Sequence, residues 1–170
     1  QLSFKTTLFS RINAAYTQRF RWEIYERSAP IKQIDFNPEI YWDSKYFAFG
    51  YEHESNGGVK DHSRSWERIY TITKHEWKWF RVSYKAWQPF FLHENGGIVE
   101  TQGKGELSVA FELEKIKLTN TARENSNRFE VSYDVGDFYI YAQAFNGLGP
   151  QIIEHNKNQH LTMIGLAITD

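Results

Sequence analysis

Apolar and polar side chains alternate with a period of two along almost the whole chain, and helical stripes are nearly absent. Between Ile12 and Ile24, one face is apolar or aromatic except for Gln18, and the other face is mostly polar or charged. This alternation predicts about eleven strands, over residues 2–9, 11–25, 33–43, 45–55, 63–74, 77–88, 101–113, 115–123, 128–135, 137–146 and 159–169. We therefore expect an all-β protein.

The connections between these strands are of two kinds. Tight turns, such as Asp43-Ser44-Lys45 and Val135-Gly136-Asp137, alternate with longer polar loops over 56–62, 89–100 and 147–158. Short turns at one end and long loops at the other are typical of an up-and-down antiparallel barrel. The 170 residues contain no repeat, linker or low-complexity tract, so we expect one domain over residues 1–170.

Charge and composition exclude several classes of protein. The 20 Lys and Arg residues against 21 Asp and Glu leave no basic surplus to hold a nucleic acid backbone. The absence of cysteine excludes disulfide scaffolds, thiolate zinc sites and cysteine nucleophiles. No apolar run approaches the roughly 18 residues of a spanning helix, which excludes a helical membrane protein. The polar alternation that begins at Gln1 predicts no signal peptide within the chain.

Alternation alone leaves two kinds of barrel open. A soluble, lipocalin-like barrel turns its apolar face inward around a ligand, whereas a membrane barrel turns that face outward to lipid. Opposite charges on neighbouring strands, such as Arg19 and Asp35, favour a cross-paired polar interior. Aromatic residues gather at strand ends, as at membrane interfaces; they are Trp22, Tyr25, Trp42, Tyr46, Phe47, Trp77, Trp79, Trp87, Phe90 and Phe91. Composition by itself supports the two kinds of barrel about equally.

The stretch from Tyr51 to Arg68 contains the residues that indicate chemistry. His53 and Ser55 are two positions apart in a predicted strand and therefore face the same way. If the next strand pairs as a hairpin, Glu67 can converge on both. An imidazole can take the proton of a serine hydroxyl near neutral pH, and a third polar group can orient the imidazole. These residue types indicate nucleophilic acyl transfer.

A turn that contains glycine follows Ser55. Backbone N–H groups in Asn56-Gly57-Gly58 could receive an oxyanion, because glycine lets the backbone approach a substrate closely. An isolated His-x-Ser pair is more often an exposed histidine beside a turn serine, so the spacing alone does not identify an active site.

The same stretch resembles the active-site signature of the outer membrane phospholipase A family, calcium-dependent acyl hydrolases of Gram-negative bacteria. That signature runs Tyr-x-His-[Asp/Glu]-Ser-Asn-Gly, a short loop, Ser-Arg-Ser-Trp, an asparagine or acidic residue, and Arg. The matching residues are Tyr51, His53, Glu54, Ser55, Asn56, Gly57, Ser63, Arg64, Ser65, Trp66 and Arg68. Similarity to the family extends over most of the chain.

The resemblance implies a transmembrane barrel of twelve strands in the bacterial outer membrane, polar inside and apolar outside, of which eleven are visible here. It also implies hydrolysis of glycerophospholipid acyl esters, with phospholipase A1 and A2 and lysophospholipase activity. By resemblance, Ser55 is the nucleophile, His53 the base and Glu67 the third member, where the best-known members have asparagine. The Gly57 N–H is expected to bind the oxyanion.

Calcium is the cofactor that the resemblance implies, and this hard cation binds oxygen ligands. The matching positions are the Gly58 carbonyl, Ser63 and Ser28 of the partner subunit. The family also uses a loop aspartate, which aligns with Lys60 here, and the adjacent Asp61 could substitute for it.

Gln18 is predicted at the contact of a homodimer. It lies in mid-strand on an apolar face, where an amide that faces lipid is costly unless it finds a partner. The family places a glutamine in an equivalent Tyr-Thr-Gln and uses it across a dimer contact. Both arguments predict that two barrels meet through this strand and that activity depends on association.

Two other functions remain open. A non-catalytic lipid-binding barrel, soluble or embedded in a membrane, is compatible with Glu67 and Lys60 at positions where the family has other residues. A passive porin ranks last, because ten to twelve strands with many long inward side chains leave little lumen.

Overall fold

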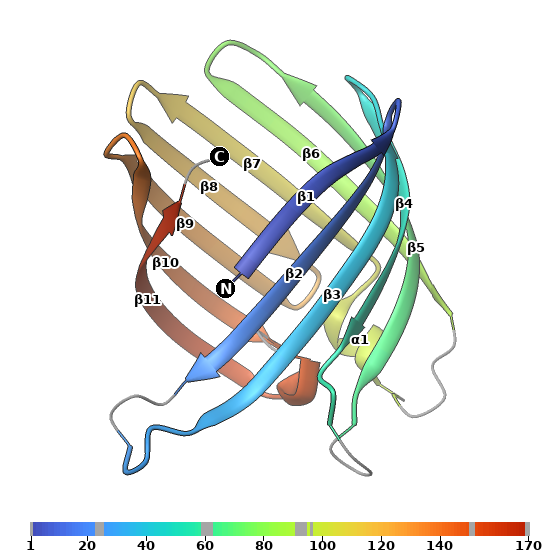
Figure 1. Cartoon of the computed structure of the whole chain (residues 1–170), viewed down its shortest axis with the longest axis vertical. Helices are drawn as coiled ribbons and strands as arrows, with labels where there is room; N and C mark the ends of the chain where they lie inside the picture. The colour runs from blue at the N-terminus through green and yellow to red at the C-terminus, as the bar shows by residue number, and fades with distance from the viewer. Residues whose placement is uncertain are drawn as a thin grey trace.

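The computed structural model describes residues 2–22, 26–58, 63–90, 95, 97–149 and 152–168. These residues form one sheet of eleven antiparallel strands in which sequence neighbours pair, curled into a barrel (Figure 1). The strands are β1 (Leu2–Phe9), β2 (Ile12–Trp22), β3 (Ile31–Asp43), β4 (Phe47–Ser55), β5 (Ser65–Glu76), β6 (Phe80–Phe90), β7 (Gly105–Leu113), β8 (Ile116–Arg123), β9 (Ser126–Asp134), β10 (Phe138–Leu148) and β11 (Asn158–Ile168). The predicted up-and-down all-β fold is confirmed.

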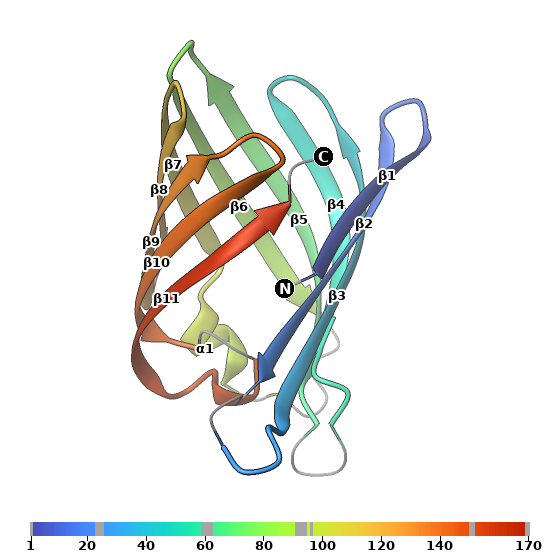
Figure 2. The same ribbon diagram turned by 60° about the vertical axis from the view of Figure 1, so that its left-hand side comes forward.

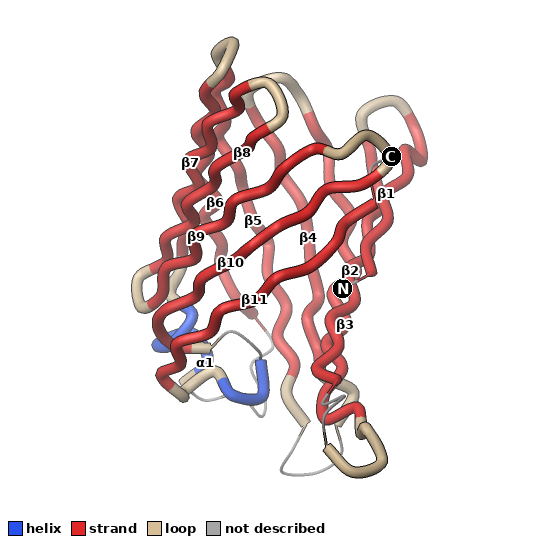
Figure 3. The backbone as a smooth tube through the Cα atoms, turned by 90° about the vertical axis from the view of Figure 1, so that its left-hand side faces the viewer, coloured by secondary structure: helices blue, strands red, loops and turns tan. Residues whose placement is uncertain are grey.

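The strand ends agree with the sequence prediction to within a few residues, with one larger difference. β7 begins at Gly105 rather than at residue 101, because a short helix, α1 (Ile98–Gln102), occupies the segment before it. A 3₁₀ turn, η2 (Ile152–Glu154), precedes β11. No helix in the described part of the chain is long and apolar enough to cross a membrane. Tight turns lie at one end of the barrel. The longer connections lie at the other, the loop end, together with the two-residue turn between β8 and β9 (Figure 3).

The two faces of the sheet differ in polarity in the way that a membrane barrel requires. Large apolar side chains are exposed on the outside; they include Leu2, Phe4, Phe20, Ile40, Phe49, Ile69, Leu107, Phe129, Ile140 and Ile164. Polar side chains are buried on the inside; they include Asn13, Gln33, Asp35, Glu52, Arg68 and Thr121. Of the two barrels that the alternation left open, the structure shows the one with an apolar exterior.

Charged side chains inside the barrel pair across neighbouring strands. Arg68 Nε lies 3.0 Å from Glu52 Oε1, and Arg68 Nη2 lies 3.0 Å from Glu54 Oε2. Arg19 Nη1 reaches Glu54 Oε1 at 3.3 Å and is also the register partner of Asp35. The predicted cross-paired interior is therefore present, and it lies directly behind the outward residues of β4.

A small apolar plug fills the loop end of the polar interior. α1 and the segment before β11 lie together at this end of the barrel (Figure 2). Their buried side chains meet aromatic residues of β5 and β6 in one cluster, which consists of Trp66, Tyr70, Trp87, Ile98 and Ile152. The plug packs the long loops against the strand ends that position the candidate site.

The sheet has two edges, β1 and β11. Within the described residues β1 pairs with β2 alone and β11 with β10 alone, and the sheet curls so that β11 approaches β1 (Figure 2). As the first and eleventh strands of an alternating series, both run in the same direction. One further strand between them could pair antiparallel with each, which agrees with a family barrel of twelve strands.

Candidate active site

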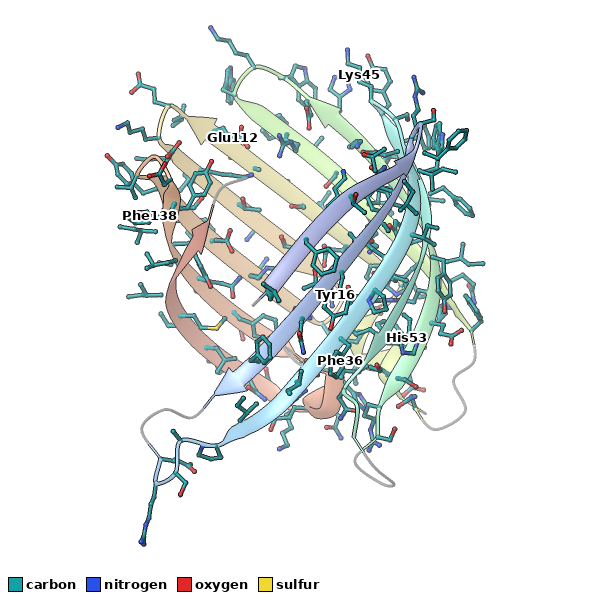
Figure 4. The ribbon with its side chains drawn as sticks, viewed as in Figure 1. Tyr16, Phe36, Lys45, His53, Glu112 and Phe138 are labelled. Atoms are coloured by element: carbon teal, nitrogen blue, oxygen red, sulfur yellow. The ribbon has the colours of Figure 1, made fainter. Side chains whose placement is uncertain are left out.

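β4 places His53 and Ser55 on the outside of the barrel, at its loop end. Ala48, Gly50 and Glu52 are buried on the inward side of this strand, so the alternate positions that follow Phe49 face outward. Figure 4 shows His53 near the loop end of its strand. The predicted common face of His53 and Ser55 is therefore present on the wall that carries the apolar exterior.

β5 brings Glu67 opposite His53. The two residues are register partners in the β4–β5 pairing, and Glu67 Oε1 lies 3.6 Å from His53 Nδ1. Both side chains are about one-third exposed, at 32% for His53 and 28% for Glu67. Because Nδ1 faces the carboxylate, Nε2 is the ring nitrogen left to act as a base.

Asn56 organises the turn that follows Ser55. Its Oδ1 accepts hydrogen bonds from the backbone N–H of Gly58 at 3.2 Å and of Arg64 at 2.8 Å. Its own N–H donates to the Arg64 carbonyl at 3.0 Å. These three bonds close the base of the β4–β5 loop and fix Gly58 relative to the strand ends.

Gly57 brings the backbone close to the outer surface beside Ser55. Its φ of 60° lies in the left-handed region that favours glycine. A Cβ at this position would lie 3.0 Å from the Phe36 ring, and Phe36 is the register partner of Ser55 on β3. A side chain at position 57 would therefore crowd the surface beside Ser55.

The predicted calcium ligands lie in two loops. Gly58 and Ser63 belong to the loop that Asn56 closes, whereas Asp61 lies outside the described residues. The Gly58 carbonyl and the Ser63 hydroxyl are hard oxygen donors of the kind that calcium prefers, so this loop fits the ion. Arg64 Nη1 donates a hydrogen bond to the Ser63 carbonyl at 2.6 Å. The Ser63 oxygen that remains for the ion is its hydroxyl.

The remaining predicted residues lie away from this loop. Ser28 is exposed in the connection between β2 and β3, with a φ of 71°. Gln18 is half-buried on the outward face of β2, between Leu2 of β1 and Phe36 of β3. Within the described residues no group of three or more His, Cys, Asp or Glu side chains could hold a metal ion.

Tyr51 was identified only as the first residue of the signature, with no role of its own. It shares the outward face of His53, and its side chain interacts with that of Glu67. Its ring centroid lies 6.0 Å from that of Phe90 on β6. The sequence places Tyr51 on the same face as His53, because the two residues are two positions apart on one strand. Its contact with Glu67 depends on register and side-chain packing, which the sequence does not show.

A sequence model of the phospholipase A1 family matches residues 1–169. The chain belongs to the phospholipase A1 family. It is 26% identical over 182 residues to phospholipase A1 of Salmonella typhimurium and of Escherichia coli K12, which covers 95% of this chain and 63% of each relative. It is 28% identical to the putative phospholipase A1 of Neisseria meningitidis serogroup B, over 91% of this chain and 48% of that protein. The chain thus spans less than two thirds of the length of these curated relatives.

Solved structures show the same fold. Outer membrane phospholipase A from Escherichia coli superimposes with a TM-score of 0.93 at 24% identity, covering 99% of this chain and 77% of that one. The calcium-bound dimer of the Salmonella typhi outer membrane phospholipase gives a TM-score of 0.90 over the same shares. An Escherichia coli active-site mutant, in which asparagine is replaced by alanine, also matches with 0.90. The predicted fold, that of an outer membrane phospholipase barrel, is confirmed.

Proposed function

We propose that this phospholipase A1 family member is a calcium-dependent outer membrane phospholipase that hydrolyses acyl esters of glycerophospholipids. One observation carries the proposal: His53, Ser55 and Glu67 share an outward surface at the loop end of a barrel with an apolar exterior. An ester reaches such a surface from the membrane, with its acyl chains along the outer wall and its carbonyl near Ser55.

The chemistry follows from the roles of these side chains. Ser55 Oγ attacks the ester carbonyl while His53 Nε2 takes the hydroxyl proton, and Glu67 stabilises the imidazolium through Nδ1. His53 returns the proton to the leaving alkoxide, so a lysophospholipid departs and an acyl-Ser55 ester remains. A water molecule, deprotonated by His53, then releases the fatty acid and restores Ser55. Attack at either acyl position accounts for A1, A2 and lysophospholipase activities.

The loop after Ser55 provides the electrostatic part of the proposal. The Gly57 N–H donates to the oxyanion. Calcium, when held by the Gly58 carbonyl, Ser63, Asp61 and Ser28 of the partner subunit, supplies positive charge that further stabilises the developing negative charge. Since one of these ligands comes from a second barrel, the active species is a homodimer, with Gln18 at the contact between subunits.

The test is fatty acid release from phospholipid in mixed micelles, with calcium or with a chelator. Wild type should release fatty acid in calcium alone, and Ser55→Ala should lower the rate by at least ~10³-fold because the nucleophile is lost. Ser65→Ala is the matched control, since Ser65 is opposite Ser55 on the same face. It should retain most of the activity.

Two results would contradict the proposal. One is release of fatty acid that survives Ser55→Ala. The other is a folded wild-type protein that binds phospholipid but releases no fatty acid in calcium. The second result would identify the chain as the non-catalytic lipid-binding barrel. That alternative is supported by Glu67, where the best-known members have asparagine, and by Lys60, where the family has an aspartate.

A further inference from the structure

Glu67 is a carboxylate on the face that turns toward lipid. Inside the barrel, Glu52 has permanent cations close by, Arg68 and Lys85, each 3.0 Å away. The ion-pair partner of Glu67 is His53, which is charged only when it is protonated. A carboxylate accepts hydrogen bonds and donates none, and a charge without compensation near hydrocarbon is costly. Neutral His53 can still donate its Nδ1–H to Glu67, but it carries no compensating charge, so Glu67 gains from a second donor that shares its negative charge.

Tyr51 supplies a donor of this kind. It is two positions before His53 on β4 and therefore faces outward as well. In the β4–β5 pairing Tyr51 is opposite Ile69, which makes Glu67 its diagonal neighbour. From this diagonal position the phenolic hydroxyl can reach the Glu67 carboxylate and donate a hydrogen bond to it. This donor does not titrate near neutral pH.

Phe90 holds the Tyr51 ring from the third strand of the site. Phe90 is opposite Glu67 in the β5–β6 pairing, and its ring centroid is 6.0 Å from that of Tyr51 with 42° between the ring planes. Glu67 is thus flanked by His53 on β4 and Phe90 on β6. The contact with Phe90 limits where the Tyr51 hydroxyl can point.

We propose that Tyr51 is a positioning residue that orients the Glu67 carboxylate toward His53. The inference rests on the proposed function, since it assigns a role in the same site. By donating to the carboxylate, the Tyr51 hydroxyl shares its negative charge and restricts its rotation, so that Oε1 stays directed at Nδ1. An asparagine, which the best-known members of the family have here, carries its own N–H donors. A carboxylate at position 67 has no donor of its own, and the Tyr51 hydroxyl provides one.

Tyr51→Phe removes the hydroxyl and keeps the ring that packs on Phe90. Because hydrolysis needs an oriented His53 and lipid binding does not, kcat should fall about tenfold while KM stays within about twofold. Tyr133→Phe is the matched control, because Tyr133 is an exposed outward tyrosine on β9, away from the site. It should leave both constants unchanged. An unchanged kcat in Tyr51→Phe, or equal losses in both variants, would overturn the proposal.

A double-mutant cycle separates positioning through Glu67 from a structural role. In a Glu67→Ala background, Tyr51→Phe should lower kcat by less than about twofold, because the group that it positions is absent. The same tenfold loss with and without Glu67 would show that the hydroxyl acts elsewhere, and would overturn the proposal. Resistance of the folded band to detergent on gels reports whether each variant has formed its barrel.

A second measurement keeps this inference distinct from the proposed function. If the wild type hydrolyses no phospholipid at all, the proposed function fails, but the coupling of Tyr51 to His53 can still be observed by NMR. At one fixed pH, Tyr51→Phe should shift the NMR resonances of the His53 imidazole ring, and Tyr133→Phe should leave them in place. His53 resonances that are identical in wild type and Tyr51→Phe would overturn the inference whatever the activity.

Discussion

His53 Nδ1 and Glu67 Oε1 are 3.6 Å apart on the surface that turns toward lipid, and the pair gains full charge when His53 takes a proton. In the proposed mechanism His53 becomes cationic just as it removes the Ser55 proton. A carboxylate opposite that cation stabilises it more strongly than a neutral amide does, whereas an amide costs less to keep beside hydrocarbon. A glutamate or an asparagine at position 67 can thus orient His53.

We expect a change of the residue at position 67 to alter kcat more than it alters binding of the phospholipid. Glu67→Ala should lower kcat by roughly tenfold to a hundredfold, because His53 keeps its basic nitrogen but loses its orientation and charge partner. Glu67→Asn should keep more of the activity than Glu67→Ala, since the amide oxygen can accept from Nδ1. Steady-state hydrolysis of a micellar phospholipid measures both effects. Equal activity in Glu67→Ala and wild type would contradict a role for Glu67.

The placement of His53 and Ser55 could be predicted from the sequence, and the contact of Tyr51 could not. A period of two assigns each residue of a strand to one face, and a slip of one residue would move all of them to the other face. His53 and Ser55 therefore had to lie on the same side. The interaction of Tyr51 with Glu67 depends on the exact pairing of β4, β5 and β6, and on the Phe90 ring.

At the scale of the element, the β4–β5 hairpin is held from inside the barrel. Arg68 on β5 lies between Glu52 and Glu54 of β4, and its guanidinium carbon is 3.9 Å from the centre of the Trp66 ring. Both carboxylates alternate with His53 and Ser55 along β4. The inward contacts of the hairpin therefore hold in register the strand whose outward residues form the site.

Removal of the inward cation should destabilise this hairpin. Arg68→Met leaves two buried carboxylates with less compensation, which should lower the free energy of unfolding by about 3–5 kcal/mol. Arg81→Met removes an exposed arginine that pairs with Glu76 at the turn end, and should cost at most about 1 kcal/mol. Guanidinium unfolding in detergent micelles measures both. Equal costs for the two variants would contradict this account.

The plug is the element that the sequence did not reveal. Its helix has only five residues, too few for a 3.6-residue period to appear, and its apolar residue Ile98 packs in an interior that is otherwise polar. His155, which follows η2, is buried in the plug, and its Nδ1 lies 2.9 Å from the Thr101 hydroxyl. Burial lowers the pKa of His155 below its ordinary value, and the nearby Arg64 lowers that pKa further.

Acid should therefore loosen the plug. A histidine with a lowered pKa in the folded state binds fewer protons than in the unfolded state, so its contribution to stability is complete above the ordinary value of 6.5 and is lost as the pH falls through the lower pKa. The free energy of unfolding should decline below about pH 6.5, and His155→Gln should make that decline shallower. Denaturant titrations across this range test the sign, and an unchanged decline in His155→Gln would contradict it.

At the scale of the whole molecule, the polarity of the wall decides what the barrel can be. Alternation and composition did not separate a soluble from a membrane barrel, because alternation is the same whichever face is inside. The difference lies in three-dimensional exposure: Phe49 and Ile69 are exposed beside the site, whereas Glu52 and Arg68 of the same strands are buried. Strand number was predictable, because each strand carries its own alternation.

The outward wall at β2 is where a second barrel is expected to contact the first. The chain contains no cysteine, so Gln18→Cys introduces a single thiol. If two copies of β2 meet, mild oxidation in calcium and mixed micelles should convert most of this variant to a disulfide-linked dimer. Phe129→Cys, on the outward face of β9, should remain monomeric. Equal cross-linking of the two variants, or none in Gln18→Cys, would contradict a dimer through β2.

Covalent labelling of the wild-type protein in micelles with a fluorophosphonate that carries an alkyl tail, followed by mass spectrometry, tests most directly whether the lipid-facing wall carries an activated nucleophile. We expect one phosphonyl adduct per chain, on Ser55, with labelling slowed at least tenfold in His53→Ala because the hydroxyl then lacks its base. An adduct on another residue, or labelling of Ser55 at the same rate without His53, would contradict the account.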